Sequence, residues 1–251
     1  MKFLISLITL AVFVSPASAQ EPDAKALAAQ LANLQQDGAS YARVKMDGKT
    51  AEGAKFTLQL QIKQRRSAKS TELLYQVLWP KERAGEAVLL KQSGGEMSGT
   101  LFTPPDKFET LNARQMKEAL FGTSLSYADV IENFFTWSNQ KIVGTEVVNK
   151  VSCQILESRS GSAAVRSWID VKRVVPMRVE KYLPSGNAFR RIDTRTVAND
   201  DTNRNIPANL TIQNLQKGTS TNLEGSKLKH GVTYGDQDFT VEGMKNLNPP
   251  G

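Results

Sequence analysis

The stretch KFTLQLQIKQ, residues 55–64, alternates apolar and polar side chains without interruption. In an extended chain, Phe56, Leu58, Leu60 and Ile62 point one way and the residues between them point the other way. This period of two predicts a β-strand with one covered face and one solvated face. The fold is therefore expected to be mainly β, and the four apolar residues are the first candidates for a covered surface.

Strand-like segments continue along the chain, and charged or Gly-bearing turns separate them. No helix lies between the early segments, which favours an antiparallel meander over alternating strand and helix units. About ten twisted strands cannot lie flat, so we expect one curved antiparallel sheet. The tail adds a short strand or turn near Phe239 and Val241. The other predicted strand segments are 72–80, 86–92, 95–105, 138–160, 163–173, 174–184, 187–199 and 205–218.

A leading helix is predicted before the first strand. Leu27, Leu31 and Leu34 recur at helical spacing, Asp23 is available as a cap, and Gly38 follows the end. The pattern is that of an amphipathic helix with one apolar face, which we expect to cover part of the sheet.

Two further helices are predicted between the two series of strands, over residues 114–121 and 126–135. They carry apolar side chains that a curved sheet can accept on its concave face. Helices in the mouth of a half-open barrel form a lid, and the apolar space beneath it suits a lipid or acyl chain. The apolar residues of this lid include Met116, Leu120, Ile131, Phe134 and Phe135.

The segment LFGTSLSYADV, residues 120–130, admits two interpretations. Ser126 and Asp129 stand three residues apart before an apolar run, which is the spacing of a helix capping box. A catalytic serine loop is the alternative, but the segment does not match the G-x-S-x-G nucleophile elbow. A triad would also have to use the only histidine, His230, which lies in a basic, loop-like segment. A helix cap is the preferred interpretation.

No other pattern indicates chemistry. The chain has one His and one Cys, far apart in sequence, so no metal site is predicted. Nucleotide-binding glycine patterns are absent, and we expect no cofactor and no catalytic residue. Cys153 cannot form an internal disulfide because it has no partner; it is either a buried small apolar residue or a reactive thiol.

The first residues read MKFLISLITLAVFVSPASAQ, which is the pattern of a cleavable signal peptide over residues 1–19 with cleavage after Ala19. The mature chain, residues 20–251, is expected to be one domain located in the periplasm. The formal charge of +7 and the pI of about 9.4 permit an anionic membrane or an acidic partner. Nucleic acid is not expected, because no nucleic-acid-binding motif is present.

Aromatic and basic residues in the predicted strands leave alternatives open. Trp79, Trp137 and Trp168 either pack in the core or line a cavity. Four arginines near strand centres either lie on a solvated outer face, which is the preferred interpretation, or point inward to hold a carboxylate or phosphate. These arginines are Arg178, Arg190, Arg191 and Arg195.

Two motifs resemble the outer-membrane lipoprotein-sorting protein family, the relatives of the periplasmic carrier LolA. The first is a G-x-S-[FL]-S-Y-x-D segment, matched by Gly122, Ser124, Leu125, Ser126, Tyr127 and Asp129. The second is a W-[IV]-D-x5-P-x-[KR] strand pair, matched by Trp168, Ile169, Asp170, Pro176 and Arg178. The resemblance covers residues 41–196. It implies an incomplete β-barrel covered by helices, whose apolar hollow binds lipid chains or lipoprotein acyl groups without catalysis or cofactor.

The leading hypothesis is therefore a monomeric periplasmic carrier for a lipid or lipoprotein. The second is an accessory protein that docks on an envelope transporter or an anionic membrane surface, and an enzyme is the third. The extended segment after Asn199 has no assigned role. The residues predicted to line the lipid-binding hollow are Phe56, Leu58, Leu60, Ile62, Trp79, Leu120, Ile131, Phe134, Phe135, Trp168 and Met177.

Overall fold

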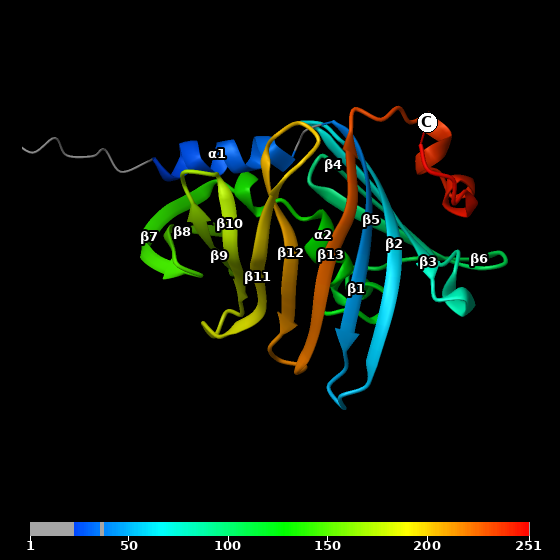
Figure 1. Cartoon of the computed structure of the whole chain (residues 1–251), viewed down its shortest axis with the longest axis horizontal. Coiled ribbons are helices and arrows are strands. Elements are labelled where there is room, and N and C mark those ends of the chain that lie inside the picture. The colour runs from blue at the N-terminus through cyan, green and yellow to red at the C-terminus, as the bar shows by residue number, and fades with distance from the viewer. Residues whose placement is uncertain (1–22, 36–37, 251) are drawn as a thin grey trace, which may run out of the picture.

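The computed structural model describes residues 23–35 and 38–250, so the predicted signal segment, residues 1–19, lies outside the described residues. Thirteen strands form one antiparallel sheet, which curves but does not close (Figure 1). The strands are β1 (Ala39–Lys49), β2 (Lys55–Arg66), β3 (Ser70–Trp79), β4 (Ala87–Ser93), β5 (Glu96–Thr103), β6 (Lys107–Thr110), β7 (Asn139–Val148), β8 (Val151–Ser160), β9 (Ala163–Asp170), β10 (Val175–Tyr182), β11 (Ala188–Asn199), β12 (Asn205–Asn214) and β13 (Thr219–His230).

The order of the strands explains how two meanders become one sheet. It runs β6-β5-β4-β3-β2-β1-β13-β12-β11-β10-β9-β8-β7, so β1 pairs with β13 at the centre and β6 and β7 are the edges. The predicted incomplete barrel is confirmed. The segment after Asn199, whose role the sequence left open, supplies the two strands that join the halves.

The stretch at residues 55–64 forms all of β2 except its last two residues and sets the register of the concave face. Leu60 lies opposite Val44, and Leu58 lies opposite Met46, on the neighbouring strand β1. All four are buried in the larger apolar core, with Leu73 and Leu90 of β3 and β4. Gly48 is required opposite Phe56, since a Cβ there would lie 2.0 Å from the Phe56 ring. The periodicity therefore identified the covered face correctly.

The opposite face of β2 differs from the prediction. The sequence indicated a solvated face at Gln61 and Lys63, yet both side chains are fully buried, with Lys63 only 1% exposed. The C-terminal segment covers them: Gln61 Nε2 donates to the carbonyl of Leu247 at 2.8 Å, and Lys63 Nζ donates to that of Asn246 at 3.2 Å. A covering segment distant in sequence leaves no trace in the period of the strand.

The C-terminal segment forms two 3₁₀ turns, η5 (Asp236–Phe239) and η6 (Glu242–Lys245), so of the short strand or turn expected near Phe239 the turn is confirmed. Phe239 and Met244 pack on the outer face of β3 and β4, against Leu74 and Leu89. In Figure 1 this segment, in red, lies on the side of the sheet away from the helices. Both faces of this half of the sheet are therefore covered.

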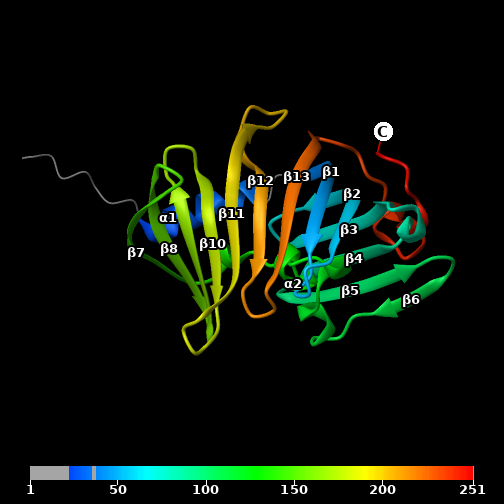
Figure 2. The same cartoon turned by 60° about the horizontal axis from the view of Figure 1, so that its bottom comes forward.

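The leading helix is confirmed as α1 (Ala24–Gln35), and Asp23 caps it by accepting from the Lys25 amide at 3.0 Å. Leu27 and Leu31 pack against Phe134, Phe135 and the inner face of β8 and β9. Figure 2 shows α1 beside the β7–β11 part of the sheet. Leu34, the third residue of the predicted stripe, remains exposed.

The central lid (residues 111–136) is less helical than predicted. The first expected helix is replaced by two short turns, because the backbone of Glu118 and Ala119 between them is extended, with ψ angles of 166° and 123°. The second helix ends after Ile131. The lid consists of η2 (Gln115–Lys117), η3 (Leu120–Gly122), α2 (Tyr127–Ile131) and η4 (Phe134–Thr136).

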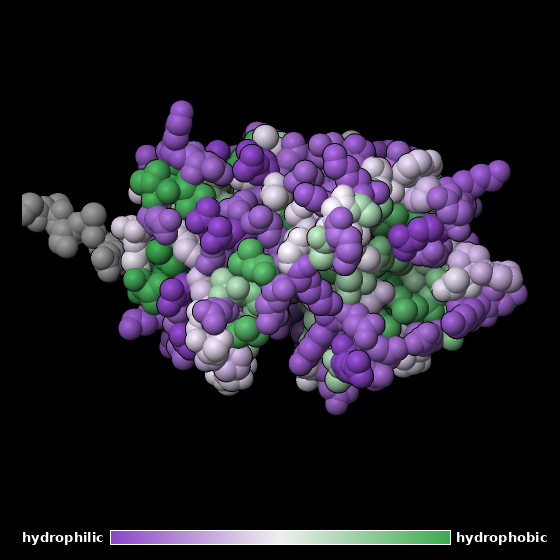
Figure 3. All heavy atoms as spheres, turned by 90° about the horizontal axis from the view of Figure 1, so that it is seen from below, coloured by the Kyte–Doolittle hydropathy of each residue, from purple (hydrophilic) through white to green (hydrophobic). Residues whose placement is uncertain are grey.

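Among residues 23–35 and 38–250, no helix combines the length and apolar character needed to cross a membrane. Large apolar side chains that reach the surface are scattered, with Val147 on the edge strand β7 the most exposed at 66%. The view from below shows several separate apolar patches among polar side chains (Figure 3).

Candidate functional site

A cleft of about 420 Å³ lies between the concave face of the sheet, α1 and the lid. We call it the hollow. Its floor comes from six strands, β1, β2, β3, β10, β11 and β13, its roof from α2 and η4, and one side from the end of α1. Most of its apolar lining side chains remain partly exposed, whereas the surrounding core is dry. The apolar lining consists of Leu34, Ala42, Ile62, Tyr75, Val130, Phe134, Phe135, Pro176, Val179, Ile192 and Leu228.

Three of the residues predicted to line a cavity lie at the hollow: Ile62, Phe134 and Phe135. Four others are packed in the closed core beneath the lid, namely Leu58, Leu60, Leu120 and Ile131. Phe56 is partly buried against the same core. Lipid contact by these residues stays a prediction, and the packed ones reach a ligand only if the lid moves.

The two tryptophans proposed as lining residues lie elsewhere. Trp79 is 47% exposed at the end of β3. Trp168 packs with Met177 and Cys153 in a separate apolar cluster, and its indole Nε1 donates to Glu146 at 2.8 Å. Since Ile169 packs beneath α1, its neighbour Trp168 points to the opposite face of the sheet. Cys153 is buried, as the first interpretation expected, and burial raises the pKa of its thiol.

A buried network of charges ties the lid to the sheet. Asp129 Oδ1 lies 2.8 Å from Lys181 Nζ, and its Oδ2 lies 3.0 Å from Arg190 Nη2. Lys181 also contacts Glu132 Oε2 at 2.6 Å. The preferred outer-face interpretation is therefore wrong for Arg190, which points inward to a carboxylate. Its Nε and Nη1 have no hydrogen-bond partner among the described residues, so Asp129 is its only ionic contact there.

Burial and pairing oppose each other in this network. Burial alone would raise the pKa of the Asp129 carboxyl, but Lys181 and Arg190 hold that pKa below its ordinary value. Burial would lower the pKa of Lys181, yet Asp129 and Glu132 raise it above its ordinary value. Asp129 and Lys181 are therefore charged near neutral pH, and their pair holds the lid closed over the hollow.

Arg178 and Arg191 lie on the opposite face and pair with carboxylates there. Arg178 Nε donates to Asp193 at 2.8 Å, and Arg191 contacts Glu180 at 2.7 Å. Arg195 is exposed. The outer-face interpretation holds for these three.

The serine question of residues 120–130 is answered by the capping box. Ser126 Oγ accepts from the Asp129 amide at 3.1 Å, and Asp129 Oδ2 accepts from the Ser126 amide at 2.8 Å. Ser124 is engaged differently, since its amide donates to Thr221 Oγ1 on β13 at 2.9 Å. Both serines therefore position the lid.

Removing the cap should have a modest effect. We expect Ser126→Ala to lower the free energy of unfolding by about 1 kcal/mol, because the Asp129 amide loses its acceptor. Denaturant titration measures this change. Ser138→Ala, at an exposed serine just beyond the lid, is the matched control and should leave stability unchanged. Equal effects of the two substitutions would contradict the capping role.

His230 is not the exposed loop residue that the sequence indicated. It ends β13 and borders the hollow, and its Nδ1 bonds to the Asp201 carboxylate. Arg204 Nη2 lies 2.8 Å from His230 Nε2 and 2.9 Å from Asp200 Oδ2. Because a guanidinium only donates, Nε2 is the acceptor and the proton resides on Nδ1. The cluster has metal-binding residue types, but the Arg204 cation already occupies its centre.

Asp200 of this cluster belongs to the turn between β11 and β12. Burial would raise the pKa of its carboxyl, but donors from Arg204 and Thr202 lower that pKa to about 2. The first residues of β12, before Asn209, do not pair with β13. Across this gap the cluster joins the β11–β12 turn to the end of β13. It closes the wall of the hollow.

The sequence of this chain matches a known family model. Residues 48–246 match a family model whose description is "Uncharacterized protein". The chain belongs to this family. No curated protein matches the chain significantly by sequence.

Solved structures share the fold at low sequence identity. A DUF1329 family protein from Desulfovibrio piger has a TM-score of 0.80 and 14% identity, over 88% of this chain and 97% of that chain. A putative outer membrane lipoprotein-sorting protein domain from Vibrio parahaemolyticus has a TM-score of 0.77 and 19% identity, over 87% and 97%. A LolA superfamily protein from Nitrosomonas europaea has a TM-score of 0.69 and 17% identity, over 87% and 98%. The chain has the LolA-like fold, as the motif resemblance implied.

Sequence reasoning missed several residues of the hollow, above all Lys181, Val179, Ile192 and Leu228. The strands β10 and β11 were predicted from the sequence, whereas β13 was not, because the residues around His230 were interpreted as a basic loop. Nothing in the sequence indicated which face would meet the lid, because that depends on the pairing of β1 with β13.

Proposed function

We propose that this protein is a non-enzymatic carrier that binds the acyl chain of a lipid or lipoprotein in the hollow. The observation that carries this proposal is the set of partly exposed apolar side chains around a cleft of about 420 Å³, within the usual range for ligand sites of roughly 300–1,000 Å³. When an acyl chain covers apolar surface that is open to water, the free energy of binding gains roughly 25 cal/mol for each Å² of apolar surface buried.

The lid gives the proposed carrier a way to admit its cargo. Leu120 and Ile131 close the core in this conformation, and the Asp129 pairs hold them in place. Moving the lid away from Lys181 and Arg190 exposes the apolar concave face of β1–β4 to an entering chain. The proposed site is therefore larger when open than when closed.

The rest of the proposal concerns location and partners. A cleavable signal peptide, residues 1–19, would deliver the mature chain, residues 20–251, to the periplasm as a single monomeric domain. A fold shared with a lipoprotein-sorting domain supports an envelope role. Docking on an anionic membrane through basic strands has less support, because Arg178 and Arg191 are paired with carboxylates.

A fluorescent fatty acid tests the proposal. We expect saturable binding of one probe per chain, with displacement by unlabelled long-chain fatty acid or phospholipid. Mass analysis of the displaced ligand should show it chemically unchanged, as a carrier requires. Absence of binding by the folded protein, at probe concentrations that saturate a known lipid-binding control, would refute the carrier.

A further inference from the structure

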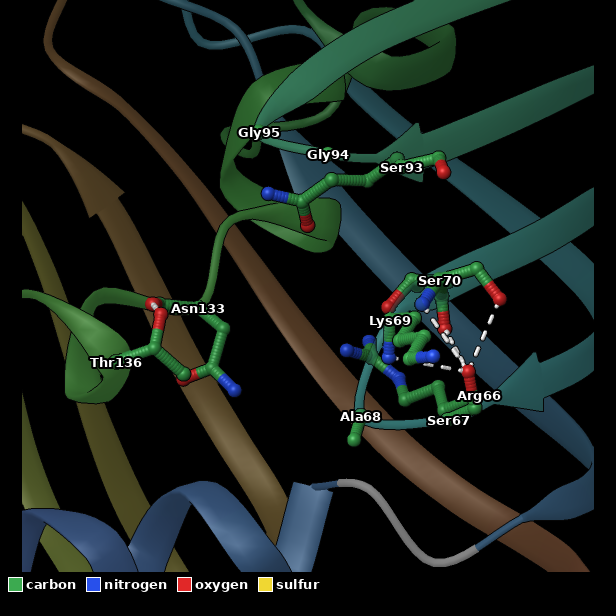
Figure 4. A pocket seen from close by; sticks show the side chains of 12 residues that line it. Arg66, Ser67, Ala68, Lys69, Ser70, Ser93, Gly94, Gly95, Asn133 and Thr136 are labelled. Carbon is green, nitrogen blue, oxygen red and sulfur yellow. Dashed lines mark hydrogen bonds between the residues drawn. The ribbon is translucent and has the colours of Figure 1, made fainter.

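A second, polar cleft of about 540 Å³ opens beside the hollow. We call it the vestibule. Arg66, Ser67, Lys69 and Ser70 form one side of it, at the β2–β3 turn. The β4–β5 turn at Gly94 and Gly95 forms a second side, and Asn133 and Thr136 of the lid lie across the gap (Figure 4).

The vestibule and the hollow adjoin each other at Arg66. Arg66 lines both clefts, and its Nη2 donates to the carbonyl of Val130, another lining residue of the hollow, at 3.5 Å. Asn133 lines the vestibule while its neighbour Phe134 lines the hollow. A molecule with its chain in the hollow would therefore place its polar end in the vestibule.

The charge of the vestibule has one sign. Arg66 and Lys69 are cations, and none of the residues that line it is acidic. The hydroxyls of Ser67 and Ser70 lie 3.0 Å apart at the same turn. Cations beside hydroxyl donors are the groups that bind phosphate oxygens through charge-assisted hydrogen bonds.

Asn133 adds an independent observation. Its Oδ1 is buried and has no hydrogen-bond partner among the described residues. A buried acceptor without a donor is costly, by about 1–3 kcal/mol, and a donor that reached this atom from the vestibule would remove that cost. A ligand hydroxyl supplies one.

We propose that the vestibule binds the headgroup of the cargo, and that this headgroup carries a phosphate and at least one hydroxyl group. The inference rests on the proposed function, because the acyl chain of the same molecule occupies the hollow. It goes further by naming the cargo class, an anionic phosphate-bearing amphiphile, and by assigning its polar end to Arg66, Lys69 and Asn133.

Three probes separate the chain from the headgroup. Palmitoyl lysophosphatidylglycerol has the chain and the phosphate, monopalmitoylglycerol has the chain without the phosphate, and glycerol 1-phosphate has the phosphate without the chain. Each probe is tested for its ability to displace a bound fluorescent fatty acid. The acylated probes are used below their own critical micelle concentrations. We expect the first probe to bind at least about tenfold more tightly than the second, and the third not to compete at millimolar concentration.

The double variant Arg66→Gln/Lys69→Gln should remove the tenfold preference for palmitoyl lysophosphatidylglycerol over monopalmitoylglycerol. The matched control Lys81→Gln/Lys107→Gln has the same change of charge at two exposed lysines outside both clefts and should keep the preference. Thermal unfolding of each variant verifies that it is folded.

The outcomes separate the two claims. Equal affinity for both acylated probes in the unsubstituted protein would overturn the headgroup assignment and leave the carrier intact. Competition by glycerol 1-phosphate at the concentration of the lysophospholipid would show a site for a free anion and also overturn it. Failure of every acylated probe to bind would refute the carrier itself.

Discussion

Asp129→Ala should unfold at a temperature about 6–20 °C below that of the unsubstituted protein. The substitution leaves Lys181 and Arg190 as buried cations that have lost a carboxylate, and Arg190 then has no ionic partner among the described residues. Breaking a buried pair by removing one member costs about 3–5 kcal/mol. For a chain of this length, each kcal/mol lowers the melting temperature by about 2–4 °C. Differential scanning calorimetry measures the shift.

The control for this prediction is Asp47→Ala. Asp47 pairs with Lys45 at 2.7 Å, but water screens both side chains. We expect little change of melting temperature from this substitution. If Asp129→Ala were as stable as Asp47→Ala, the lid would not be held by its charges.

The pair of Asp129 and Lys181 makes the stability of the folded protein depend on pH. The pKa of Asp129 is lowered in the folded state, so its stabilising effect is complete above the pKa of the unfolded chain, near 4, and is lost as the pH falls through the folded pKa. The raised pKa of Lys181 changes nothing between pH 5 and 8, because that lysine stays protonated there. Acid unfolding of Asp129→Asn should therefore be less steep below pH 4 than that of the unsubstituted protein.

Ile192→Asp should weaken the binding of a long-chain fatty acid by at least about 100-fold. Ile192 lines the hollow from β11 and is only partly buried, so a carboxylate there stays hydrated in the free protein. An entering acyl chain would have to remove that water, and burying an unpaired charge costs several kcal/mol. A 100-fold loss corresponds to about 2.8 kcal/mol. Titration with the fluorescent fatty acid measures it.

Val147→Asp is the matched control, because it makes the same kind of change on the exposed edge strand β7, away from the hollow. It should bind the probe with unchanged affinity. Equal losses in the two variants would show that the probe binds outside the hollow, and an unchanged affinity in both would exclude Ile192 from the binding surface.

The sequence predicted the fold better than the lid. Strand periodicity depends on a repeating pattern, so the covered face of β2 at Leu58 and Leu60 was identified from residues 55–64 alone. The lid depends on single backbone conformations: the extended backbone at Glu118 and Ala119 breaks the first predicted helix, and helix propensity does not contain that information. The buried face of Gln61 and Lys63 was also missed, because its cover comes from residues about 180 positions away.

Only part of the candidate site was predicted, because local patterns identify covered residues but not the contacts between distant segments. Phe134 and Phe135 were identified because an apolar run beside a capping box predicts a covered lid. Arg190 was assigned to the wrong face, since a strand arginine is usually solvated and only the position of Asp129 explains its burial. Trp168 was considered because it is an aromatic residue in a predicted strand, yet its face is set by the register with β8 and β10.

The most direct test of the carrier is native mass spectrometry of the protein isolated from the periplasm without detergent, followed by lipid extraction. We predict a population heavier than the mature chain by the mass of one acyl-bearing molecule, and loss of that population in Ile192→Asp. A spectrum with the mass of the mature chain alone, unchanged after incubation with excess lysophospholipid and fatty acid, would contradict the account.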